Sequence, residues 1–217
     1  MLLGVVAMRA GVKLQYDGAD MRVTAPMSSF APKDTIYAAV STANHMGVWG
    51  AAEALLGTNP IAIAFPREDA EPVCLDMATT SIPFNRVRNA RREGHPLPPD
   101  TAVDAQGRPT TDAQAAVAVT PLGGREYGHK GYALALVVDL LCGPLLGNPY
   151  GPHIPSMHGA LDRPRRLGAF FIALDPERFA GGAALAALVD ALARDLAAEP
   201  GAPLMPGDPE IAVAAER

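Results

Sequence analysis

Several features that would assign a protein to a class at once are scarce in this sequence of 217 residues. It has two cysteines, Cys74 and Cys142, each inside an apolar run, which favours buried free thiols in a reducing compartment over a disulfide. The longest apolar stretch, residues 132–143, contains Asp139 and is shorter than the ~20 residues that span a bilayer. The apolar residues 1–8 lack a basic leader and a cleavage pattern, so they do not predict a secretion signal. We therefore expect a cytoplasmic protein without a membrane partner.

Positive charge is also scarce. The sequence has 18 Lys and Arg against 23 Asp and Glu, which gives a formal net charge of -5. A protein of this charge has no broad positive field to attract a phosphate backbone, so we expect no nucleic-acid partner. One basic run contains Arg86, Arg88, Arg91 and Arg92. Because no aromatic residues are interleaved with these arginines, the run is interpreted as a solvated helix face.

Motifs of several enzyme classes are missing. No G-x-G-x-x-G follows a strand-like run, which argues against a Rossmann domain. Ser28 and Ser29 have no G-x-S-x-G setting, so a serine hydrolase has no support. The histidines are His45, His95, His129, His153 and His158. Their spacing is not that of metal ligands and no acidic cluster accompanies them, so no metal is predicted.

What the sequence does contain is a mixed α/β pattern. Short apolar runs bounded by Gly, Pro or Asp predict buried strands at Thr35–Val40, Ile61–Phe65, Val73–Met77 and residues 167–174. Residues 131–142 are apolar on nearly every face and are followed by a Gly-Pro stop signal, so they predict a central helix buried on all sides.

A second helix is amphipathic. Leucine and valine recur at three- and four-residue spacing at Leu185, Leu188, Val189, Leu192 and Leu196, and the Pro-Gly pair at 200–201 ends the pattern. The 21 Gly and 21 Pro indicate many loops, chiefly residues 96–111 and 147–166. The second loop is long enough to serve a site or an interface.

Three segments could carry chemistry. Residues 122–131, L-G-G-R-E-Y-G-H-K-G, place glycines and Lys130 at the start of the predicted central helix, where amide N–H groups and the helix dipole favour a phosphate. A Gly-rich turn with a solvated lysine fits equally well. Residues 75–81, L-D-M-A-T-T-S, end a strand in small hydroxyl residues, which alone favour capping of a following helix over holding ribose or phosphate. His45 could take a proton from a substrate hydroxyl, although its surroundings alone favour a structural histidine.

Several phrases occur together and in a recognisable order: L-L-G-T-N-P-I-A-I-A-F-P at 55–66, L-D-M-A-T-T at 75–80 and G-H-K-G-Y-A-L-A-L-V-V-D-L-L-C-G at 128–143. R-P-R-R-L-G-A-F-F-I-A-L-D-P-E-R-F at 163–179 and P-G-D-P-E at 206–210 follow. Through these phrases the sequence resembles the malate/L-lactate dehydrogenase family, which includes ureidoglycolate, sulfolactate and diketogulonate enzymes and reductases of cyclic imino acids. The resemblance implies a mixed α/β, non-Rossmann, NAD(P)-binding fold in a homodimer.

The resemblance also implies a site. NAD or NADP would be held by the strand-end segment, the G-H-K-G helix start and a C-terminal loop, here Asp76, Met77, Ala78, Thr79, Thr80, Ser81, His129, Lys130, Gly207, Asp208 and Pro209. The implied reaction transfers a hydride between the nicotinamide and a small 2-hydroxy or 2-oxo acid, with His45 of A-N-H-M-G as the catalytic proton acceptor or donor. No residue selects NAD over NADP. The alternative is an inactive or fragmentary member that keeps only nucleotide binding or dimerisation.

We further expect an incomplete, truncated version of the family fold. No S-H-G motif precedes A-N-H-M-G, and only residues 48–54 separate A-N-H-M-G from L-G-T-N-P, where the family has a helix, a strand and a P-x-G-G loop. Residues 1–66 are predicted to be a remnant of the substrate or core region, 67–165 the NAD(P)-binding region, and 166–217 a C-terminal strand and helix that return to the core. A missing strand exposes ladder groups and lowers stability.

Overall fold

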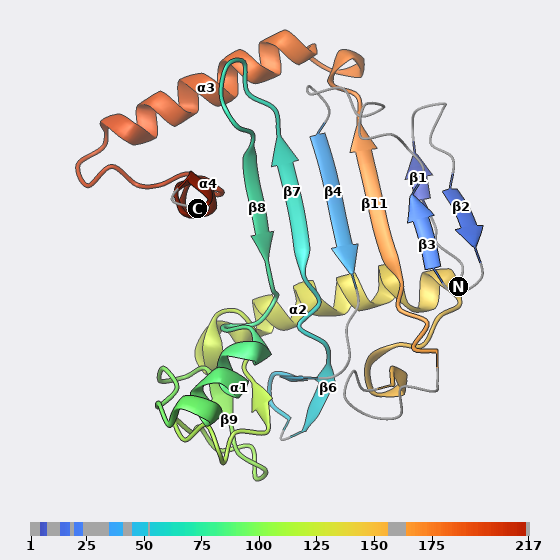
Figure 1. The fold of residues 1–217 in the computed structure, drawn as a ribbon, viewed down its shortest axis with the longest axis vertical. Helices are drawn as coiled ribbons and strands as arrows, with labels where there is room; N and C mark the ends of the chain where they lie inside the picture. The colour runs from blue at the N-terminus through green and yellow to red at the C-terminus, as the bar shows by residue number, and fades with distance from the viewer. Residues whose placement is uncertain are drawn as a thin grey trace. The chain divides into compact units, whose positions relative to one another are not determined.

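The computed structural model describes residues 5–7, 14–17, 20–23, 35–40, 45–51, 53–155 and 164–215 (Figure 1). The chain divides into two compact units that alternate along the sequence. Unit 1 comprises Met1–Gly4, Ala39–Ile61 and Met77–Phe170, and unit 2 comprises Val5–Ala38, Ala62–Asp76 and Phe171–Arg217. The three consecutive regions predicted from the sequence stay predictions, as do the roles given to them.

Most of a five-stranded sheet lies in unit 2. Its order is β1 (Val5–Ala7), β11 (Ala169–Leu174), β4 (Thr35–Val40), β7 (Ile61–Phe65) and β8 (Val73–Met77). Strand β1 pairs in parallel with β11. Three predicted strands are confirmed with the same bounds, whereas β11 begins at Ala169 rather than at residue 167. Gly168 packs against the carbonyl of Cys142, and there it has no room for a Cβ. A separate antiparallel hairpin, β2 (Leu14–Asp17) with β3 (Asp20–Val23), was not predicted.

The C-terminal part of unit 2 is helical. A 3-10 turn, η4 (Pro176–Arg178), precedes helix α3 (Gly182–Ala198), and helix α4 (Asp208–Ala215) follows. The predicted amphipathic helix is confirmed, but its apolar face is only partly covered, because Leu188 is 67% exposed and Leu192 is 54% exposed. The polar tie to the rest of unit 2 is Asp190, whose Oδ1 lies 2.6 Å from Arg67 Nε.

Unit 1 contains a small mixed sheet. Its order is β6 (Ala54–Leu56), β5 (Met46–Gly47), β10 (Ala118–Val119) and β9 (Ala102–Val103). Strand β10 pairs in parallel with β5 and antiparallel with β9. Helix α1 (Phe84–Glu93) packs its buried Val87 into a cluster with Leu97, Ala102 and Val119. Strand β9 lies inside residues 96–111, so that segment is only partly the loop that the sequence predicts.

The central helix of unit 1 is α2 (Gly124–Cys142), followed by the 3-10 turns η2 (Pro144–Leu146) and η3 (Gly151–His153). The predicted start at residue 131 is wrong, because the helix already begins at Gly124. Burial on all sides is also wrong, since Val137 and Leu140 are about half exposed while Ala135 and Val138 are fully buried.

By length and composition alone, Gly124–Leu146 is the one described helical segment that could cross a membrane, with a mean hydropathy of 1.3. Core helices of globular proteins meet the same criterion, and this one buries Asp139. Both cysteines are free thiols, as predicted; Cys142 is buried and Cys74 half-buried.

Candidate functional site

The sheet of unit 1 holds His45 by its backbone. Its N–H donates to the Leu56 carbonyl at 2.8 Å, and its own carbonyl accepts from the Val119 N–H at 3.0 Å. The half-buried imidazole lies against the ring of Phe84, with 4.4 Å between the ring centroids. His45 therefore has a fixed backbone and an aromatic neighbour.

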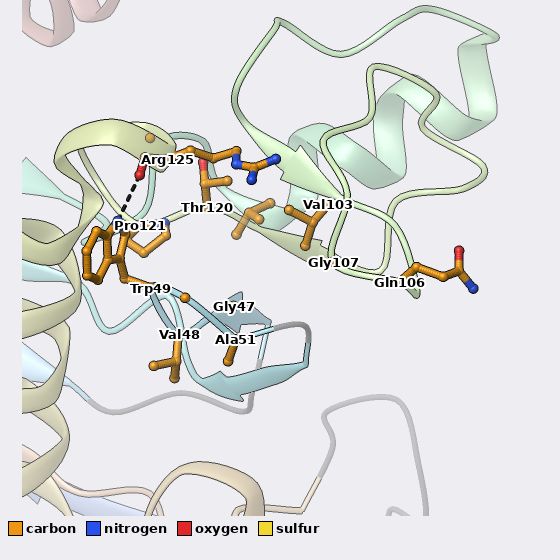
Figure 2. A pocket seen from close by; sticks show the side chains of 13 residues that line it. Gly47, Val48, Trp49, Ala51, Val103, Gln106, Gly107, Thr120, Pro121 and Arg125 are labelled. Carbon is orange, nitrogen blue, oxygen red and sulfur yellow. Dashed lines mark hydrogen bonds between the residues drawn. The ribbon is translucent and has the colours of Figure 1, made fainter.

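A hollow of about 400 Å³ begins two residues after His45, at Gly47 (Figure 2). Its walls are residues 47–51, parts of β9 and β10 with the turn after β9, and the first turn of α2. The volume lies in the range of small-molecule sites. Among the described lining residues, Arg125 carries the only charged side chain, so the hollow suits a ligand with an anionic group.

Trp49 joins this hollow to the G-H-K-G motif. Its Nε1 donates to the Arg125 carbonyl at 2.8 Å, as Figure 2 shows, and its ring meets His129 edge to face at 5.5 Å. Gly128 makes the approach possible, because a Cβ there would come within 3.2 Å of Trp49. Sequence reasoning missed Trp49, although it is the one tryptophan of the sequence and follows the A-N-H-M-G segment closely.

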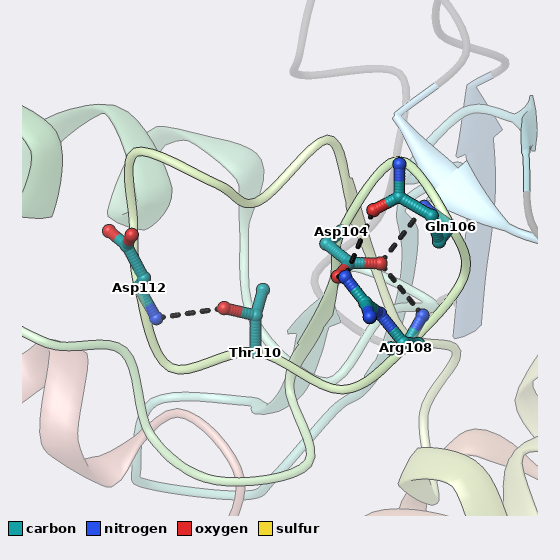
Figure 3. A network of polar contacts seen from close by, with 5 residues as sticks. All are labelled: Asp104, Gln106, Arg108, Thr110 and Asp112. Atoms are coloured by element: carbon teal, nitrogen blue, oxygen red, sulfur yellow. Dashed lines mark hydrogen bonds and ion pairs between the residues drawn. The ribbon is translucent and has the colours of Figure 1, made fainter.

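The turn that supplies Gln106 and Gly107 to the lining of the hollow is held by Asp104. Figure 3 shows the contacts of Asp104 with Gln106 and Arg108. The backbone N–H groups of Gln106 and Arg108 each donate to Asp104 Oδ1 at 2.9 Å, and Arg108 Nε donates to Oδ2 at 3.0 Å. The backbone N–H of Arg108, helped by its guanidinium, holds the pKa of Asp104 below the ordinary 3.8. This turn therefore keeps its shape while its carboxylate is ionised.

Residues 79–81 of the strand end and residues 120–122, which precede α2, lie side by side in unit 1. The Leu122 N–H donates to the Thr79 carbonyl at 3.0 Å, and the Ser81 N–H donates to the Thr120 carbonyl at 3.0 Å. Ser81 Oγ adds a bond to the Pro121 carbonyl at 2.7 Å. The strand end thus runs along the segment that leads directly into α2.

The threonine hydroxyl groups of this strand end donate hydrogen bonds to backbone carbonyls of the protein itself. Thr79 is fully buried, and its hydroxyl donates to the carbonyls of Thr58 and Asn59 at 3.0 and 3.1 Å. Thr80 Oγ1 donates to the Ile82 carbonyl at 2.8 Å. Capping of the next helix, which the residues alone favoured, is wrong, because the N-cap of α1 is Pro83 without a side-chain bond.

The start of α2 already binds an acidic side chain. The Arg125 N–H lies 3.1 Å from each carboxylate oxygen of Asp100, and the Gly124 N–H donates to the Pro121 carbonyl at 2.9 Å. Gly124 allows this approach, since a Cβ there would collide with the Asp100 carboxylate. Lys130 lies beyond this first turn, exposed, with Nζ 5.7 Å from the Tyr127 ring centroid. An incoming phosphate would therefore meet the side chains of α2 rather than these two amides.

A buried network of hydrogen bonds joins Asn59 to helix α2 and to Gly151. Asn59 Nδ2 donates to the Ala135 carbonyl at 3.0 Å and to Asp139 Oδ1 at 3.2 Å, and the Gly151 N–H donates to Asp139 Oδ2 at 3.0 Å. Burial raises the pKa of Asp139, although the hydrogen bonds from Asn59 Nδ2 and from the Gly151 N–H favour its ionised form. Asn59 has a φ of 35°, a conformation that asparagine tolerates better than most residues.

Of the remaining predicted cofactor residues, Met77 and Ala78 belong to unit 1, whereas Asp76 meets the C-terminal loop in unit 2. A second hollow, of about 300 Å³, is lined by residues that include Cys74, Asp76, Gly207 and Pro209. The Cys74 N–H donates to the Pro206 carbonyl at 3.0 Å, which holds the C-terminal loop against β8. The Asp208 carboxylate turns back to accept from the Met205 N–H at 2.9 Å.

The basic run is not wholly a solvated face, so that interpretation needs correction. Arg91 Nε donates to the Ala113 carbonyl at 2.7 Å, and a second nitrogen of the same guanidinium donates to the Ala116 carbonyl. Arg92, in contrast, has a side chain that is 73% exposed and pairs with Glu93. Among the described residues, no group of His, Cys, Asp and Glu could hold a metal ion.

Comparison with known proteins identifies the family. The profile of malate/L-lactate dehydrogenase matches residues 21–217. The chain is 34% identical over 183 residues to (2R)-3-sulfolactate dehydrogenase (NADP(+)) of Chromohalobacter salexigens, which covers 83% of this chain and 53% of the relative. It is 40% identical over 131 residues to ureidoglycolate dehydrogenase (NAD(+)) of Escherichia coli O157:H7, with 60% and 36% covered.

Solved structures agree. Malate dehydrogenase from Entamoeba histolytica matches with a TM-score of 0.76 and 25% identity over 85% of this chain and 55% of that one. Sulfolactate dehydrogenase from Methanocaldococcus jannaschii matches with a TM-score of 0.75 and 32% identity. The match covers 85% of this chain and 54% of that one. The chain thus spans about half the length of these relatives. The mixed α/β, non-Rossmann fold predicted from the sequence is confirmed, and the chain belongs to the malate/L-lactate dehydrogenase family.

Proposed function

We propose that this chain carries the NAD(P)-binding core of an oxidoreductase that transfers a hydride between NAD or NADP and a small 2-hydroxy or 2-oxo acid. The observation that carries the proposal is the side-by-side placement of Thr79–Ser81 and residues 120–122, next to a hollow with Arg125 as its charged side chain. The matched relatives include one named for NADP(+) and one named for NAD(+), which supports a nicotinamide cofactor without selecting either.

The residues around the hollow fit an anionic ligand. Gly47, Gly50 and Gly107 lie in the lining and leave the backbone open to close approach. Arg125 offers a guanidinium, which pairs with a carboxylate or a phosphate in a two-pronged geometry. Trp49 supplies an apolar wall of the hollow. When bound, the nicotinamide supplies or accepts the hydride.

His45 is the proposed proton acceptor or donor of the substrate hydroxyl. A neutral imidazole suits this role near neutral pH. Its backbone is held between β6 and β10, so the ring is carried by a fixed support.

We assign the cofactor's diphosphate to the exposed side chains of His129 and Lys130 on α2. Asp76, Gly207 and Pro209, around the hollow of unit 2, are the second proposed contact. The polypeptide is proposed to act as a cytoplasmic homodimer, which light scattering coupled to size-exclusion chromatography tests.

A second candidate function is nucleotide binding or dimerisation without turnover. One observation favours it: the Asp100 carboxylate already engages an amide at the start of α2. A carboxylate at that position opposes the approach of a phosphate.

The test combines binding and turnover. NADH and NADPH are titrated by fluorescence, and oxidation of each is followed with a panel of 2-oxo acids and cyclic imino acids. We expect His45→Gln to lower kcat by about 10²- to 10⁴-fold, with the affinity for the reduced cofactor unchanged. His95→Gln, at an exposed position just after the C-cap of α1, is the matched control and keeps full activity.

Wild-type turnover that persists in His45→Gln contradicts the role of His45. Cofactor binding without turnover in the wild type supports the second candidate. Absence of binding for both cofactors contradicts the proposed reaction and the nucleotide-binding form of the second candidate, and leaves dimerisation, which light scattering tests.

A further inference from the structure

Beside His45 lies a stack that the reaction described above does not use. The Phe84 ring centroid is 4.4 Å from that of His45, with the ring planes tilted by 40°. The guanidinium carbon of Arg91 lies 5.8 Å from the centre of the same Phe84 ring. Phe84 therefore contacts the candidate proton carrier and a cation, and both distances are those of favourable aromatic and cation–π contacts.

Arg91 is itself immobilised. It donates hydrogen bonds to the carbonyls of Ala113 and Ala116, in the segment between β9 and β10. Phe84 packs at the edge of the cluster that contains the buried Val87 and Val119. The stack is thus anchored to the core of unit 1 and to the strand β10 that accompanies His45.

We propose that Phe84 and Arg91 are positioning residues for His45, a role that rests on the proposed function. The aromatic face limits rotation of the imidazole, and the anchored guanidinium limits motion of the aromatic face. A proton carrier held in one orientation favours the geometry needed for transfer, and a displacement of about 1 Å can lower a rate by about 10²-fold.

The neighbouring arginine provides the matched comparison. Arg92 follows Arg91 on α1, yet its side chain is 73% exposed and its partner is Glu93 on the same helix. The turn of Arg91 toward the protein is therefore specific to that position. Arg92→Lys changes the same residue type without touching the stack.

The experiment uses Phe84→Leu, Phe84→Tyr, Arg91→Lys and the control Arg92→Lys in the full chain. The first readout is NMR of histidine-labelled protein, with the His45 signals assigned by their loss in His45→Gln. We expect the ring-current shift of His45 to disappear in Phe84→Leu, to persist in Phe84→Tyr and Arg92→Lys, and to weaken in Arg91→Lys, because lysine lacks the two-pronged guanidinium.

The second readout separates kcat from KM. We expect Phe84→Leu to lower kcat by about 10- to 100-fold while KM and the affinity for NADH stay unchanged, which is the signature of misplaced catalytic geometry. Phe84→Tyr keeps the ring and restores kcat. If Phe84→Leu does not fold, Phe84→Tyr and Arg91→Lys still decide, since the first should be normal and the second impaired.

If the His45 signals are unchanged in Phe84→Leu, the contact between Phe84 and His45 is contradicted, whether or not the protein is catalytically active. Normal kcat in Phe84→Leu, or equal loss in Phe84→Tyr and Phe84→Leu, overturns the positioning role. A further outcome is a wild-type protein that shows the ring-current shift of His45 and yet has no turnover. That result refutes the proposed reaction and with it the positioning role, whereas the contact between Phe84 and His45 is upheld.

Discussion

The two units of this chain use polar groups differently. In unit 1, Asn59, Thr79 and Asp139 are buried and joined by hydrogen bonds that connect three segments far apart in the sequence. In unit 2, helix α3 is tied by the ion pair of Asp190 with Arg67, which stays partly open to solvent. Asn59 of L-G-T-N-P and Thr79 of L-D-M-A-T-T therefore stabilise the fold of unit 1 through hydrogen bonds within the protein. Disruption should therefore be more costly in unit 1.

The largest expected effect is at a close backbone approach in unit 1. A Cβ at Gly131 would lie 2.8 Å from the Cα of Leu122 and would also meet its backbone nitrogen and oxygen. Because backbone cannot rotate away, Gly131→Ala should lower the free energy of unfolding by about 3 kcal/mol or more in urea denaturation. Gly147→Ala, with open space around the glycine, should show only the cost of its positive φ, about 1 kcal/mol. Equal losses would show that the approach of α2 to Leu122 is not tight.

The next effect is at the buried amide. Asn59→Ala leaves a buried carbonyl and the Asp139 carboxylate each short of a donor, so we expect a loss of about 2 to 3 kcal/mol in chemical denaturation. Asn85→Ala, at an exposed position on α1, should change stability by less than about 0.5 kcal/mol. A loss at Asn59 no larger than at Asn85 contradicts the supporting network.

The carboxyl groups of Asp139 and Asp190 should make opposite contributions to the pH dependence of the free energy of unfolding. Burial raises the pKa of Asp139 above 3.8, so its contribution to stability is present below pH 3.8 and is lost as pH rises through the folded value. The Arg67 side chain and the Glu68 N–H lower the pKa of Asp190 below 3.8, so its contribution is present above pH 3.8 and is lost as pH falls through the folded value.

Unfolding free energies measured across the acidic range test this contrast. Relative to wild type, Asp139→Asn should gain stability as pH rises, whereas Asp190→Asn should lose the part of stability that depends on ionisation. Asp195→Asn, exposed on the same helix α3, serves as the control. Parallel curves for the two variants would contradict the assignment.

The smallest effect should be at the exposed leucines of α3. Leu188 is 67% exposed, so Leu188→Gln should change the free energy of unfolding by less than about 0.5 kcal/mol. Ala186→Gln, on the buried face of the same helix, should cost about 1 to 3 kcal/mol by overpacking. A comparable loss at Leu188 would mean that another chain covers it in solution.

The sequence predicts the four longest described strands, misses the seven shorter ones, and predicts the contacts of the site poorly. Thr35–Val40, Ile61–Phe65 and Val73–Met77 have their predicted bounds, because short apolar runs between Gly, Pro and polar residues leave little freedom of register. The predicted start of α2 is too late because Gly123, Gly124 and Gly128 resemble a turn, whereas Gly124 allows the close approach of Asp100 and Gly128 that of Trp49.

The side chains that shape the site could not be read from local patterns. Arg91 reaches carbonyls more than twenty positions away, and the bond from Trp49 to Arg125 spans 76 positions. Such contacts depend on the fold as a whole. Of the residues predicted to contact the cofactor, Thr79 and Ser81 lie beside residues 120–122 in unit 1, and Asp76 lies beside Gly207 and Pro209 in unit 2. Their contact with a cofactor stays a prediction.

The central claim is that the strand end and the start of α2 together hold a nicotinamide cofactor. Hydrogen–deuterium exchange with and without saturating NADH or NADPH tests it most directly, because it reports which backbone segments the cofactor protects. We predict slower exchange at residues 76–81 and 122–131 with at least one of the two cofactors. Protection confined to other segments, or none with either cofactor, would contradict the account.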